Sequence, residues 1–364
     1  MTRRNFGLGA LAGLVPELAL SQHAAVLGDA PPGTVWLNAN ENPDGPPEAV
    51  GTAVTRALPD VGRYNHRVFP VFYEALARSA GVKPEQVISG AGSTEVIHCA
   101  LEAFTSSSRP LITAWPTWEM ARDVTEAAGK PVVKVPLDKN WSADVDRMAS
   151  EARKHGGGLI HLGNPNNPTS SVTSGERIRW LADNLPAHTV LLIDEAYIQF
   201  TEPRDNITGL SLVRAGKAVV ITRTFSKLYG MAGMRIGFGS ARSDLIQKMQ
   251  PFRNNVGSIL SVRGAMAAME LGEPFVAERR TRRNEIRGQF CAWLNQRGVR
   301  HIPPFANFVL IHTGHDVRDL IPKFLAAGVA VGRRFEGMPE WLRVTIGTDD
   351  EMEKLKNVFS KINF

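Results

Sequence analysis

A short segment around Lys227 carries the residue types that could hold a phosphorylated carbonyl cofactor. Thr224 and Ser226 precede the lysine, a Gly-rich run follows it, and Arg235 comes eight residues later. A lysine amine can form a Schiff base with a carbonyl carbon, and two hydroxyls with a guanidinium can converge on one phosphate. The segment is therefore typical of a pyridoxal phosphate site, although a Ser-Lys pair near an arginine is on its own an ordinary solvated loop.

Further candidate residues follow predicted strands along the chain. Ser93 and Thr94 follow a Gly-x-Gly turn at the start of a predicted helix, where unpaired backbone N–H groups favour phosphate. Trp118 could stack on a flat heteroaromatic ring, and Asn167 lies in a loop with two Asn-Pro steps. Each motif alone also has a plain structural explanation, as a turn, a rim tryptophan or a loop.

Asp194 and Tyr197 follow another of these strands. A carboxylate deep in an α/β protein needs a partner, and a protonated pyridinium nitrogen would be one. Tyr197 could reach the phenolic oxygen of the same ring, whereas a helix cap is the ordinary explanation for Asp194. All these motifs lie at the carboxyl ends of predicted strands, the edge at which open α/β sheets bind ligands.

The elements that must position these residues are short apolar runs alternating with amphipathic stretches. Near-continuous apolar runs are expected of strands buried on both faces of a mostly parallel sheet, so the order indicates an α/β fold. After residue 240 we expect a long helical region at about 243–297, strands at 307–312 and 342–346, and a last helix from 349. The seven runs predicted as strands are 86–89, 110–113, 131–135, 158–162, 189–193, 218–222 and 235–238.

Composition divides the chain into four parts. Residues 1–30 are interpreted as a leader and 31–50 as an N-terminal arm rich in Pro, Gly and Asn. Residues 51–245 are predicted to form a large cofactor-binding domain, and 246–364 a smaller α+β domain. With 364 residues, 43% of them hydrophobic, the chain is long enough for two such cores.

The first residues carry a targeting pattern. Arg3-Arg4 precedes Phe6 and a short apolar run at 8–15, which resembles a twin-arginine export signal. The run is too short to span a bilayer, so we expect no stable membrane anchor. We expect a periplasmic or secreted protein if the leader functions and a cytoplasmic one if it does not.

The charged residues and the cysteines narrow the class of partner. The net charge of +6 is spread without a basic stripe interleaved with aromatics, so we expect no nucleic-acid partner. The nine histidines have no metal-ligand spacing. Cys99 and Cys291 lie in separate apolar contexts and are expected to be buried thiols, not a disulfide or a metal site.

Taken together, these motifs resemble the fold-type I class I/II aminotransferases, and most of all the histidinol-phosphate aminotransferase branch. The resemblance covers nearly all of residues 34–360. It implies a mostly parallel seven-stranded sheet in the large domain and a small C-terminal α+β domain. The motifs that carry it are, in order, 37–43, 63–64, 90–95, 116–118, 164–169, 194–197, 224–227 with Arg235, and 342–348.

The resemblance implies a role for each candidate on the cofactor side. Lys227 forms the Schiff base and then moves the substrate proton, Asp194 pairs with the pyridinium, and Trp118 stacks on the ring. Asn167 and Tyr197 hydrogen-bond to the phenolic oxygen. The phosphate is bound by Ser93, Thr94, Thr224, Ser226 and Arg235, together with Tyr64 from the neighbouring subunit, which implies a homodimer.

On the substrate side the resemblance is less complete. It implies that Arg343 binds the α-carboxylate and that Asn40 lies nearby, but the second arginine could be Arg333 or Arg334. Two positions also depart from the branch. Asp44 stands where an aromatic residue is common, and the loop 164–170 ends in Pro-Thr-Ser instead of Pro-Thr-Gly. We expect Asp44, Asn307 and the two arginines to set specificity.

The function implied is that of a pyridoxal-phosphate-dependent aminotransferase. It would move an amino group between an amino acid, or an amino phosphate such as histidinol phosphate, and a 2-oxo acid by a ping-pong mechanism. One alternative is a decarboxylase of the threonine-phosphate type, in which a different bond is aligned with the ring. The other is a non-catalytic ligand-binding module, which the intact Lys227 disfavours.

Overall fold

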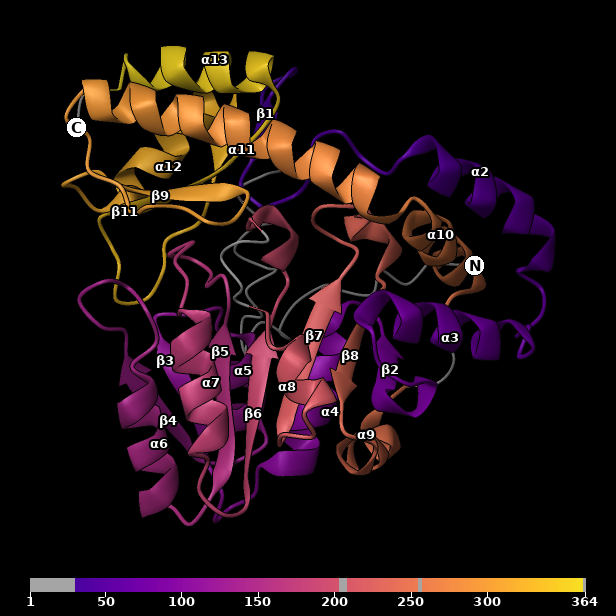
Figure 1. Cartoon of the computed structure of the whole chain (residues 1–364). Helices are drawn as coiled ribbons and strands as arrows, with labels where there is room; N and C mark the ends of the chain where they lie inside the picture. The colour runs from indigo at the N-terminus through magenta and orange to yellow at the C-terminus, as the bar shows by residue number, and fades with distance from the viewer. Residues whose placement is uncertain (1–29, 203–207, 255–256, 363–364) are drawn as a thin grey trace, which may run out of the picture.

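The structure is a computed structural model that describes residues 30–202, 208–254 and 257–362. The expected leader with its Arg3-Arg4 motif therefore lies outside the described residues, apart from Ala30. A seven-stranded sheet fills the centre of the large part of the molecule (Figure 1). Its strand order is β2-β8-β7-β6-β5-β3-β4.

All seven predicted strands are confirmed, with ends shifted by at most three residues. Only β8 runs antiparallel to its neighbours, β2 and β7, so the other six strands point the same way. Their carboxyl ends therefore share one edge of the sheet. The strands are β2 (Val87–Gly90), β3 (Leu111–Trp115), β4 (Val132–Pro136), β5 (Gly158–Gly163), β6 (Thr189–Asp194), β7 (Val219–Thr224) and β8 (Gly237–Ala241).

Helices cover both faces of this sheet, which explains why most residues of its strands are apolar. Leu191 packs in one core cluster and Leu192 in the other, as side chains of successive strand residues must. In Figure 1, α6 (Val145–Lys154), α7 (Gly175–Asp183) and α8 (Leu210–Arg214) lie in front of the sheet, with α4 (Ser93–Phe104) and α5 (Met120–Ala127) behind it.

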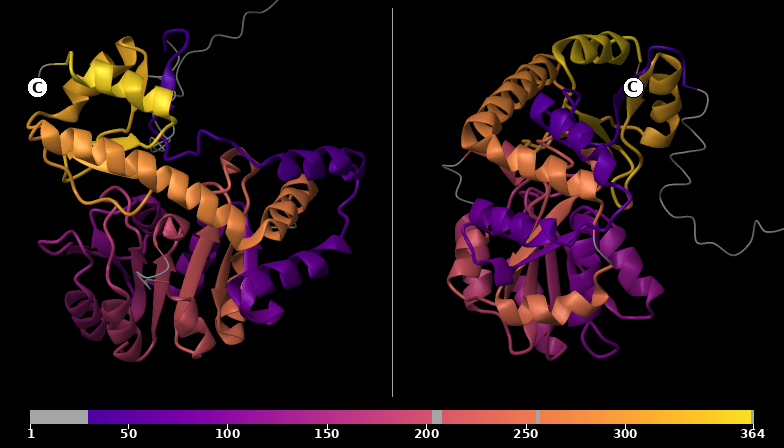
Figure 2. Two further views of the ribbon diagram at one scale, coloured as in Figure 1. Left: turned by 45° about the horizontal axis from the view of Figure 1, so that its top comes forward. Right: turned by 90° about the vertical axis from the view of Figure 1, so that its right-hand side faces the viewer.

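The C-terminal elements build a second core above the carboxyl edge (Figure 2). β9 (Phe308–His312) pairs antiparallel with β11 (Trp341–Thr345), and α12 (Val317–Ala326) and α13 (Asp349–Phe359) pack with them. Part of the N-terminal arm is a strand: β1 (Val35–Leu37) pairs parallel with β10 (Val329–Val331). The arm thus joins the C-terminal part before it crosses the site.

The helical region expected at about 243–297 is present, and it is divided into three helices. This region forms α9 (Ser243–Met249), α10 (Ile259–Glu270) and α11 (Gly272–Gln296). Pro251, which has no N–H to donate, follows α9, and Gly272 has a φ of +66° where the chain turns into α11. Both signals are present in the sequence and outweigh the amphipathic pattern.

Two further helices, α2 (Glu48–Ala57) and α3 (Val68–Ala80), lie beside α10 at one end of the molecule (Figure 1). Within the described residues, no helix is long and apolar enough to cross a membrane. In the same ranges, no group of three or more His, Cys, Asp and Glu side chains is placed to hold a metal ion. Cys99 is buried and Cys291 half-buried, and both are free thiols.

Candidate active site

Lys227 lies just beyond the carboxyl end of β7, beneath the N-terminal arm. Its Nζ donates a hydrogen bond to the Ala39 carbonyl at 3.1 Å and lies 5.7 Å from the centre of the Tyr197 ring. Burial and, to a smaller extent, the nearby Arg343 charge lower the pKa of Lys227 to about 8, while Glu41 acts in the opposite direction. A lysine with a lowered pKa is more often neutral, which a nucleophilic amine requires.

Asp194 is the last residue of β6, on the strand next to the one that leads to Lys227. Its Oδ1 accepts a hydrogen bond from the Thr222 hydroxyl at 2.8 Å. Burial raises the pKa of Asp194 to about 6, and the Thr222 hydrogen bond acts in the opposite direction. A carboxylate with this desolvation is stabilised by a cationic partner, such as a protonated ring nitrogen.

Tyr197 is buried between the sheet edge and the C-terminal part. Its hydroxyl accepts a hydrogen bond from the Asn40 amide at 3.0 Å, and its ring meets Phe308 edge-on with the ring centres 5.0 Å apart. Burial raises the pKa of the Tyr197 phenol, so it remains a neutral hydrogen-bonding group. Asn40 comes from the arm, and the arm therefore forms one wall of the site.

The predicted phosphate-side residues gather at the N-terminus of α4. The Thr224 hydroxyl donates to Ser226 Oγ at 2.9 Å, and Nη1 of Arg235 lies 3.4 Å from the same oxygen. The Arg235 Nη2 also donates to the Ala91 carbonyl at 3.4 Å, one residue before Gly92. Ser93 and Thr94 open the helix itself.

Two glycines keep this corner free of side chains. A Cβ at Gly92 would lie 2.6 Å from the Arg235 Nη2, and the φ of this residue is +77°. A Cβ at Gly237 would lie 2.5 Å from the Ser93 nitrogen. Close backbone approach at a helix N-terminus with two hydroxyls and a guanidinium makes a cradle of the size and charge that suit a phosphate.

Arg343 lies on β11, across the site from the phosphate side. The side chain is buried, with 6% of the residue exposed. Its Nη1 donates to Asn167 Oδ1 at 2.7 Å and its Nη2 to the Asn38 carbonyl at 2.6 Å. The Arg343 Nε has no acceptor among the residues that the structure describes. Burial lowers the pKa of Arg343 to about 10.

The structure separates the two arginines between which the sequence left the choice open. Arg333 forms an ion pair with the buried Glu119, and its guanidinium lies 4.5 Å from the centre of the Phe335 ring. The Arg343 guanidinium lies 5.0 Å from the centre of the same Phe335 ring, so Arg333 and Arg343 share one aromatic neighbour. Arg334 instead pairs with Asp316 at 3.0 Å, at the start of α12.

Other predicted residues are placed differently. Tyr64 is 70% exposed and stacks on His66 with the ring centres 5.7 Å apart, so it is not gathered with the phosphate-side residues of its own chain. Trp118 is half-buried and packs against the core cluster behind the sheet. Asp44 directs its carboxylate to Arg283, and the Asn307 amide donates to the arm carbonyls of Asn40 and Glu41.

Sequence reasoning missed several groups in the site. The carbonyls of Asn38 and Ala39 accept from Arg343 and Lys227, but a backbone carbonyl has no sequence signature. Thr222 could have been found, because it lies two residues before Thr224 on the same face of β7. Glu119 follows Trp118 directly, yet its partner Arg333 is remote in sequence.

The residues present fit pyridoxal phosphate. An amine, a carboxylate and a tyrosine lie along the carboxyl edge of the sheet, and a side-chain-free cradle lies beyond them at a helix N-terminus. Across the site, the Nε of Arg343 is a donor without an acceptor among the described residues, which suits it to the anionic end of a substrate. These are the groups that the cofactor and an amino substrate require.

Comparisons with known proteins agree with this geometry. The family model for aminotransferase class I and II matches residues 32–359. The chain is 33% identical over 321 residues to the histidinol-phosphate aminotransferase of Halalkalibacterium halodurans, covering 87% of this chain and 86% of the relative. It is 30% identical over 352 residues to that of Akkermansia muciniphila, covering 95% of both chains.

A solved structure gives the same result. The histidinol-phosphate aminotransferase of Sinorhizobium meliloti, in complex with pyridoxal-5'-phosphate, matches with a TM-score of 0.83 and 25% identity, over 90% of this chain and 92% of that one. These relatives do not favour the decarboxylase or the non-catalytic alternative. The chain therefore belongs to the class I and II aminotransferases, as a pyridoxal-phosphate-dependent, fold-type I member of the histidinol-phosphate aminotransferase-like branch.

Proposed function

We propose that Lys227 is the catalytic amine of this aminotransferase and that Asp194, Tyr197 and Arg343 complete its site. The observation that carries the proposal is the convergence of these side chains beneath the arm, where Arg343 and Asp194 lie close enough to Lys227 to change its pKa in opposite directions. Perturbed titration in a buried cluster is common at functional sites.

Each residue has a task that follows from its position. When bound, pyridoxal phosphate supplies a carbonyl carbon for an amine and a ring that accepts electrons. Lys227 would take the proton from the substrate Cα and return one, because its amine lies in the site, where it donates a hydrogen bond to the Ala39 carbonyl. Asp194 would keep the ring nitrogen protonated, while Tyr197 and Asn167 would hydrogen-bond to the phenolic oxygen.

The phosphate-side and stacking roles are part of the same proposal. Ser93, Thr94, Thr224, Ser226 and Arg235 would hold the cofactor phosphate, supported by their gathering at the N-terminus of α4. Trp118 would cover the ring from the side of β3. The half-buried indole, four residues after Ala114 of that strand, supports this role.

We propose that Arg343 binds the anionic group of either substrate. This group would be the carboxylate of an amino acid or 2-oxo acid, or the phosphate of histidinol phosphate, the compound in the names of the relatives. The unpaired Nε of Arg343 supports this, since a buried donor without an acceptor costs about 1–3 kcal/mol. Arg333, beside the same Phe335 ring, would meet the rest of the substrate.

An absorbance titration tests both proposals. The holoenzyme is scanned while histidinol phosphate, glutamate and a panel of other amino acids are added one at a time. We expect the visible band of the bound cofactor to be lost with the true donor and restored by a 2-oxo acid, and we expect neither change in Lys227→Ala. Turnover retained in Lys227→Ala would refute the assignment of the catalytic amine.

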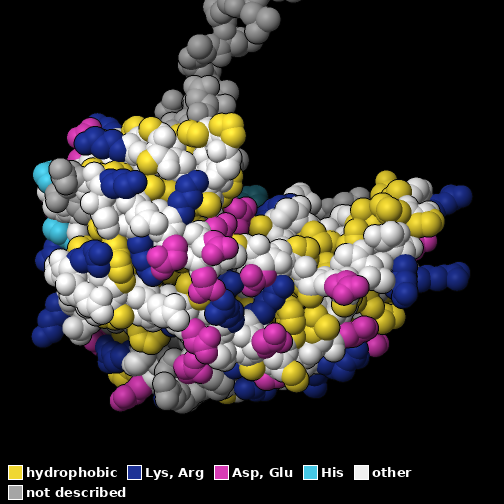
Figure 3. All heavy atoms as spheres, turned by 90° about the horizontal axis from the view of Figure 1, so that it is seen from above, with side chains coloured by type: hydrophobic (Ala, Val, Ile, Leu, Met, Phe, Trp, Pro, Cys, Tyr) yellow, Lys and Arg dark blue, Asp and Glu magenta, His cyan; other side chains and the backbone are white. Residues whose placement is uncertain are grey.

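We further propose a homodimer in which Tyr64 reaches the partner's phosphate. Four large apolar side chains are exposed from the end of α2 into α3, at Leu58, Val61, Tyr64 and Val71. The space-filling view shows hydrophobic side chains at this end of the molecule (Figure 3). Such a patch marks an interaction surface in a folded chain.

Mixing two inactive variants tests this arrangement. If Tyr64 serves the partner's site, a dimer of Lys227→Ala and Tyr64→Ala subunits has one intact site, so random mixing should restore about one quarter of wild-type activity. If Tyr64 serves its own subunit, no hybrid site is intact and mixing restores nothing. A chain that remains monomeric in light scattering would also contradict the proposal.

We also propose that residues 1–30 direct export, on the evidence of Arg3-Arg4 and the apolar run behind them. Arg3→Lys with Arg4→Lys should leave the chain in the cytoplasmic fraction, whereas an equal distribution of the wild-type and variant chains would refute the role in export.

For the domains, we propose a division near Gly272. The proposal is supported by Val262 and Ala265 of α10, which pack in the core cluster of the sheet although the sequence predicted the small domain from residue 246.

A further inference from the structure

The N-terminal arm is attached to the catalytic groups at several successive residues. The Asn38 carbonyl accepts from Arg343, the Ala39 carbonyl accepts from Lys227 at 3.1 Å, and the Asn40 amide donates to Tyr197 at 3.0 Å. Thus the position of three consecutive arm residues decides where three side chains of the site point.

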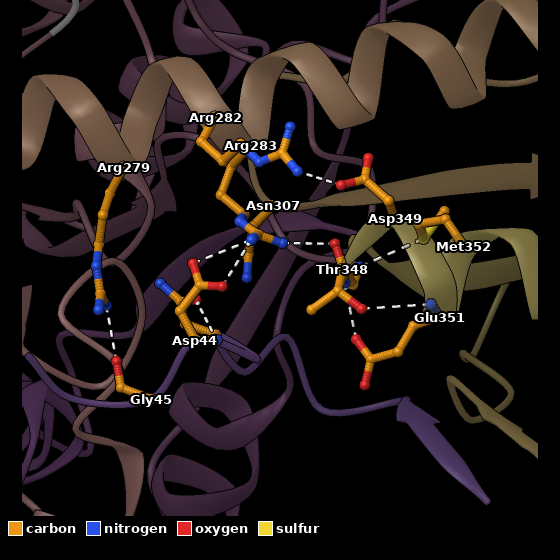
Figure 4. A network of polar contacts seen from close by, with 12 residues as sticks. Asp44, Gly45, Arg279, Arg282, Arg283, Asn307, Thr348, Asp349, Glu351 and Met352 are labelled. Carbon is orange, nitrogen blue, oxygen red and sulfur yellow. Dashed lines mark hydrogen bonds and ion pairs between the residues drawn. The ribbon is translucent and has the colours of Figure 1, made fainter.

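The far end of this arm is held by a buried arginine of α11 (Figure 4). The Nη2 of Arg283 donates to both carboxylate oxygens of Asp44, at 2.9 and 3.0 Å. Its Nη1 donates to the Gly347 carbonyl, just after β11. The Arg283 side chain is 3% exposed, against 35% for Asp44. One guanidinium therefore joins the helix, the arm and the segment after the Arg343 strand.

A second arginine one turn earlier extends the network to the residue after Lys227. The Arg279 Nη1 donates to the Gly45 carbonyl at 2.8 Å and to the Leu228 carbonyl at 3.1 Å. Leu228 also accepts from the Asn42 amide of the arm at 2.8 Å. The arm and α11 thus hold the backbone beside Lys227 from two sides.

The negative charge of Asp44 stabilises the packing of Arg279 and Arg283 against the arm. Arg279 and Arg283 are four residues apart on one helix, where like charges are neighbours and repel. Burial lowers the pKa of the Arg279 guanidinium, Asp44 raises it, and Arg283 lowers it. Without Asp44, the guanidinium groups of Arg279 and Arg283 would be left with backbone carbonyl acceptors only. Even with Asp44 present, the Arg283 Nε has no acceptor among the described residues.

We propose that Asp44 and Arg283 form a clamp that positions Lys227 by fixing the arm over it. This inference rests on the proposed catalytic role of Lys227. Asp44 is thereby a positioning residue, whereas the sequence predicted that it sets substrate specificity. When the clamp is intact, the Ala39 carbonyl and the Leu228 backbone hold the amine in one place, and the arm keeps water from that side of the site.

Three variants test the clamp. Asp44→Asn keeps the shape of the side chain and removes its charge, while Arg283→Lys keeps the charge but cannot reach Asp44 and Gly347 together. Arg282→Gln is the matched control, because Arg282 is the adjacent residue of α11 and pairs with the exposed Asp349 instead of the arm (Figure 4).

Two measurements are made on each variant. In the cofactor-free protein, hydrogen exchange of residues 38–45 should be at least about five-fold faster in Asp44→Asn and Arg283→Lys than in wild type and Arg282→Gln. In the holoenzyme, kcat should fall about tenfold with KM changed less, and the visible circular dichroism of the bound cofactor should weaken.

Unchanged exchange of the arm, or equal losses in Asp44→Asn and Arg282→Gln, would overturn the proposal. If Arg283→Lys does not fold, the test rests on Asp44→Asn, because the Asp44 side chain is partly exposed and its replacement should be tolerated. Lys227→Ala is assayed in parallel. Activity in that variant would refute the role of Lys227, whereas a silent Asp44→Asn beside an inactive Lys227→Ala would refute only the clamp.

Discussion

Replacement of Arg343 should show how the enzyme holds its substrate. The Arg343 Nε is buried without an acceptor in the described chain, whereas Nη1 and Nη2 already bond to Asn167 and Asn38. A substrate anion that accepts from Nε and shares one Nη would gain two charge-assisted hydrogen bonds, each contributing about 1.5–3 kcal/mol. Arg343→Lys keeps the positive charge but loses the planar guanidinium with its two adjacent donors, so one of these hydrogen bonds is lost.

The expected loss for Arg343→Lys is therefore about 10- to 150-fold in kcat/KM, and at least about 100-fold for Arg343→Gln. Both half-reactions should be affected, because amino donor and 2-oxo acid use the same arginine. The assay is single-turnover absorbance of the bound cofactor with each substrate, after thermal unfolding has shown that the variants fold.

Arg334→Lys is the matched control, because Arg334 pairs with Asp316 at the start of α12. It should change kcat/KM less than twofold. If Arg343→Lys stayed within twofold of wild type while Arg334→Lys lost activity, the substrate side of the site would have been assigned to the wrong arginine.

Three further results are expected. Burial lowers the pKa of Lys227 from 10.5 to about 8. Between pH 8 and pH 10.5 the unfolded chain therefore binds more protons at this lysine than the folded chain does. The free energy of unfolding of the cofactor-free protein should rise with pH over this range, by at most about 3 kcal/mol. Urea unfolding should show this rise, and its persistence in Lys227→Met would contradict it. Thr348 accepts from the Glu351 N–H at 3.3 Å and its own N–H donates to the Glu351 carboxylate at 2.8 Å, so Thr348→Ala should cost about 1 kcal/mol in the same assay. Gly237→Ala places a methyl group 2.5 Å from the Ser93 nitrogen and should weaken cofactor affinity at least about tenfold in an equilibrium titration, whereas wild-type affinity would show that the cradle is wrongly placed.

The strands and their carboxyl-end motifs were predictable because both follow from local chemistry. A strand buried on two faces is mostly apolar, as residues 158–162 and 189–193 are apart from His161 and Thr189. Lys227 and Asp194 could be placed at one edge for the same reason. The order of the strands in the sheet, with β8 between β2 and β7, depends on tertiary pairing and has no local signal.

The contacts between the arm and the site were not predictable. They use the carbonyls of Asn38 and Ala39, which every residue possesses, and they join positions almost 200 or more than 300 residues apart. The choice between Arg333 and Arg334 was open for a related reason. The two side chains are adjacent in an irregular segment, and only the positions of Glu119 and Asp316 show which way each one points.

The role of Lys227 is tested most directly by borohydride reduction of the holoenzyme followed by peptide mapping. Reduction makes the link between the lysine and the cofactor permanent, so the modified side chain can be located by mass spectrometry. The account predicts a phosphopyridoxyl group on Lys227, within the peptide 224–235. A label on another lysine, or a holoenzyme that remains unlabelled at Lys227, would contradict the account.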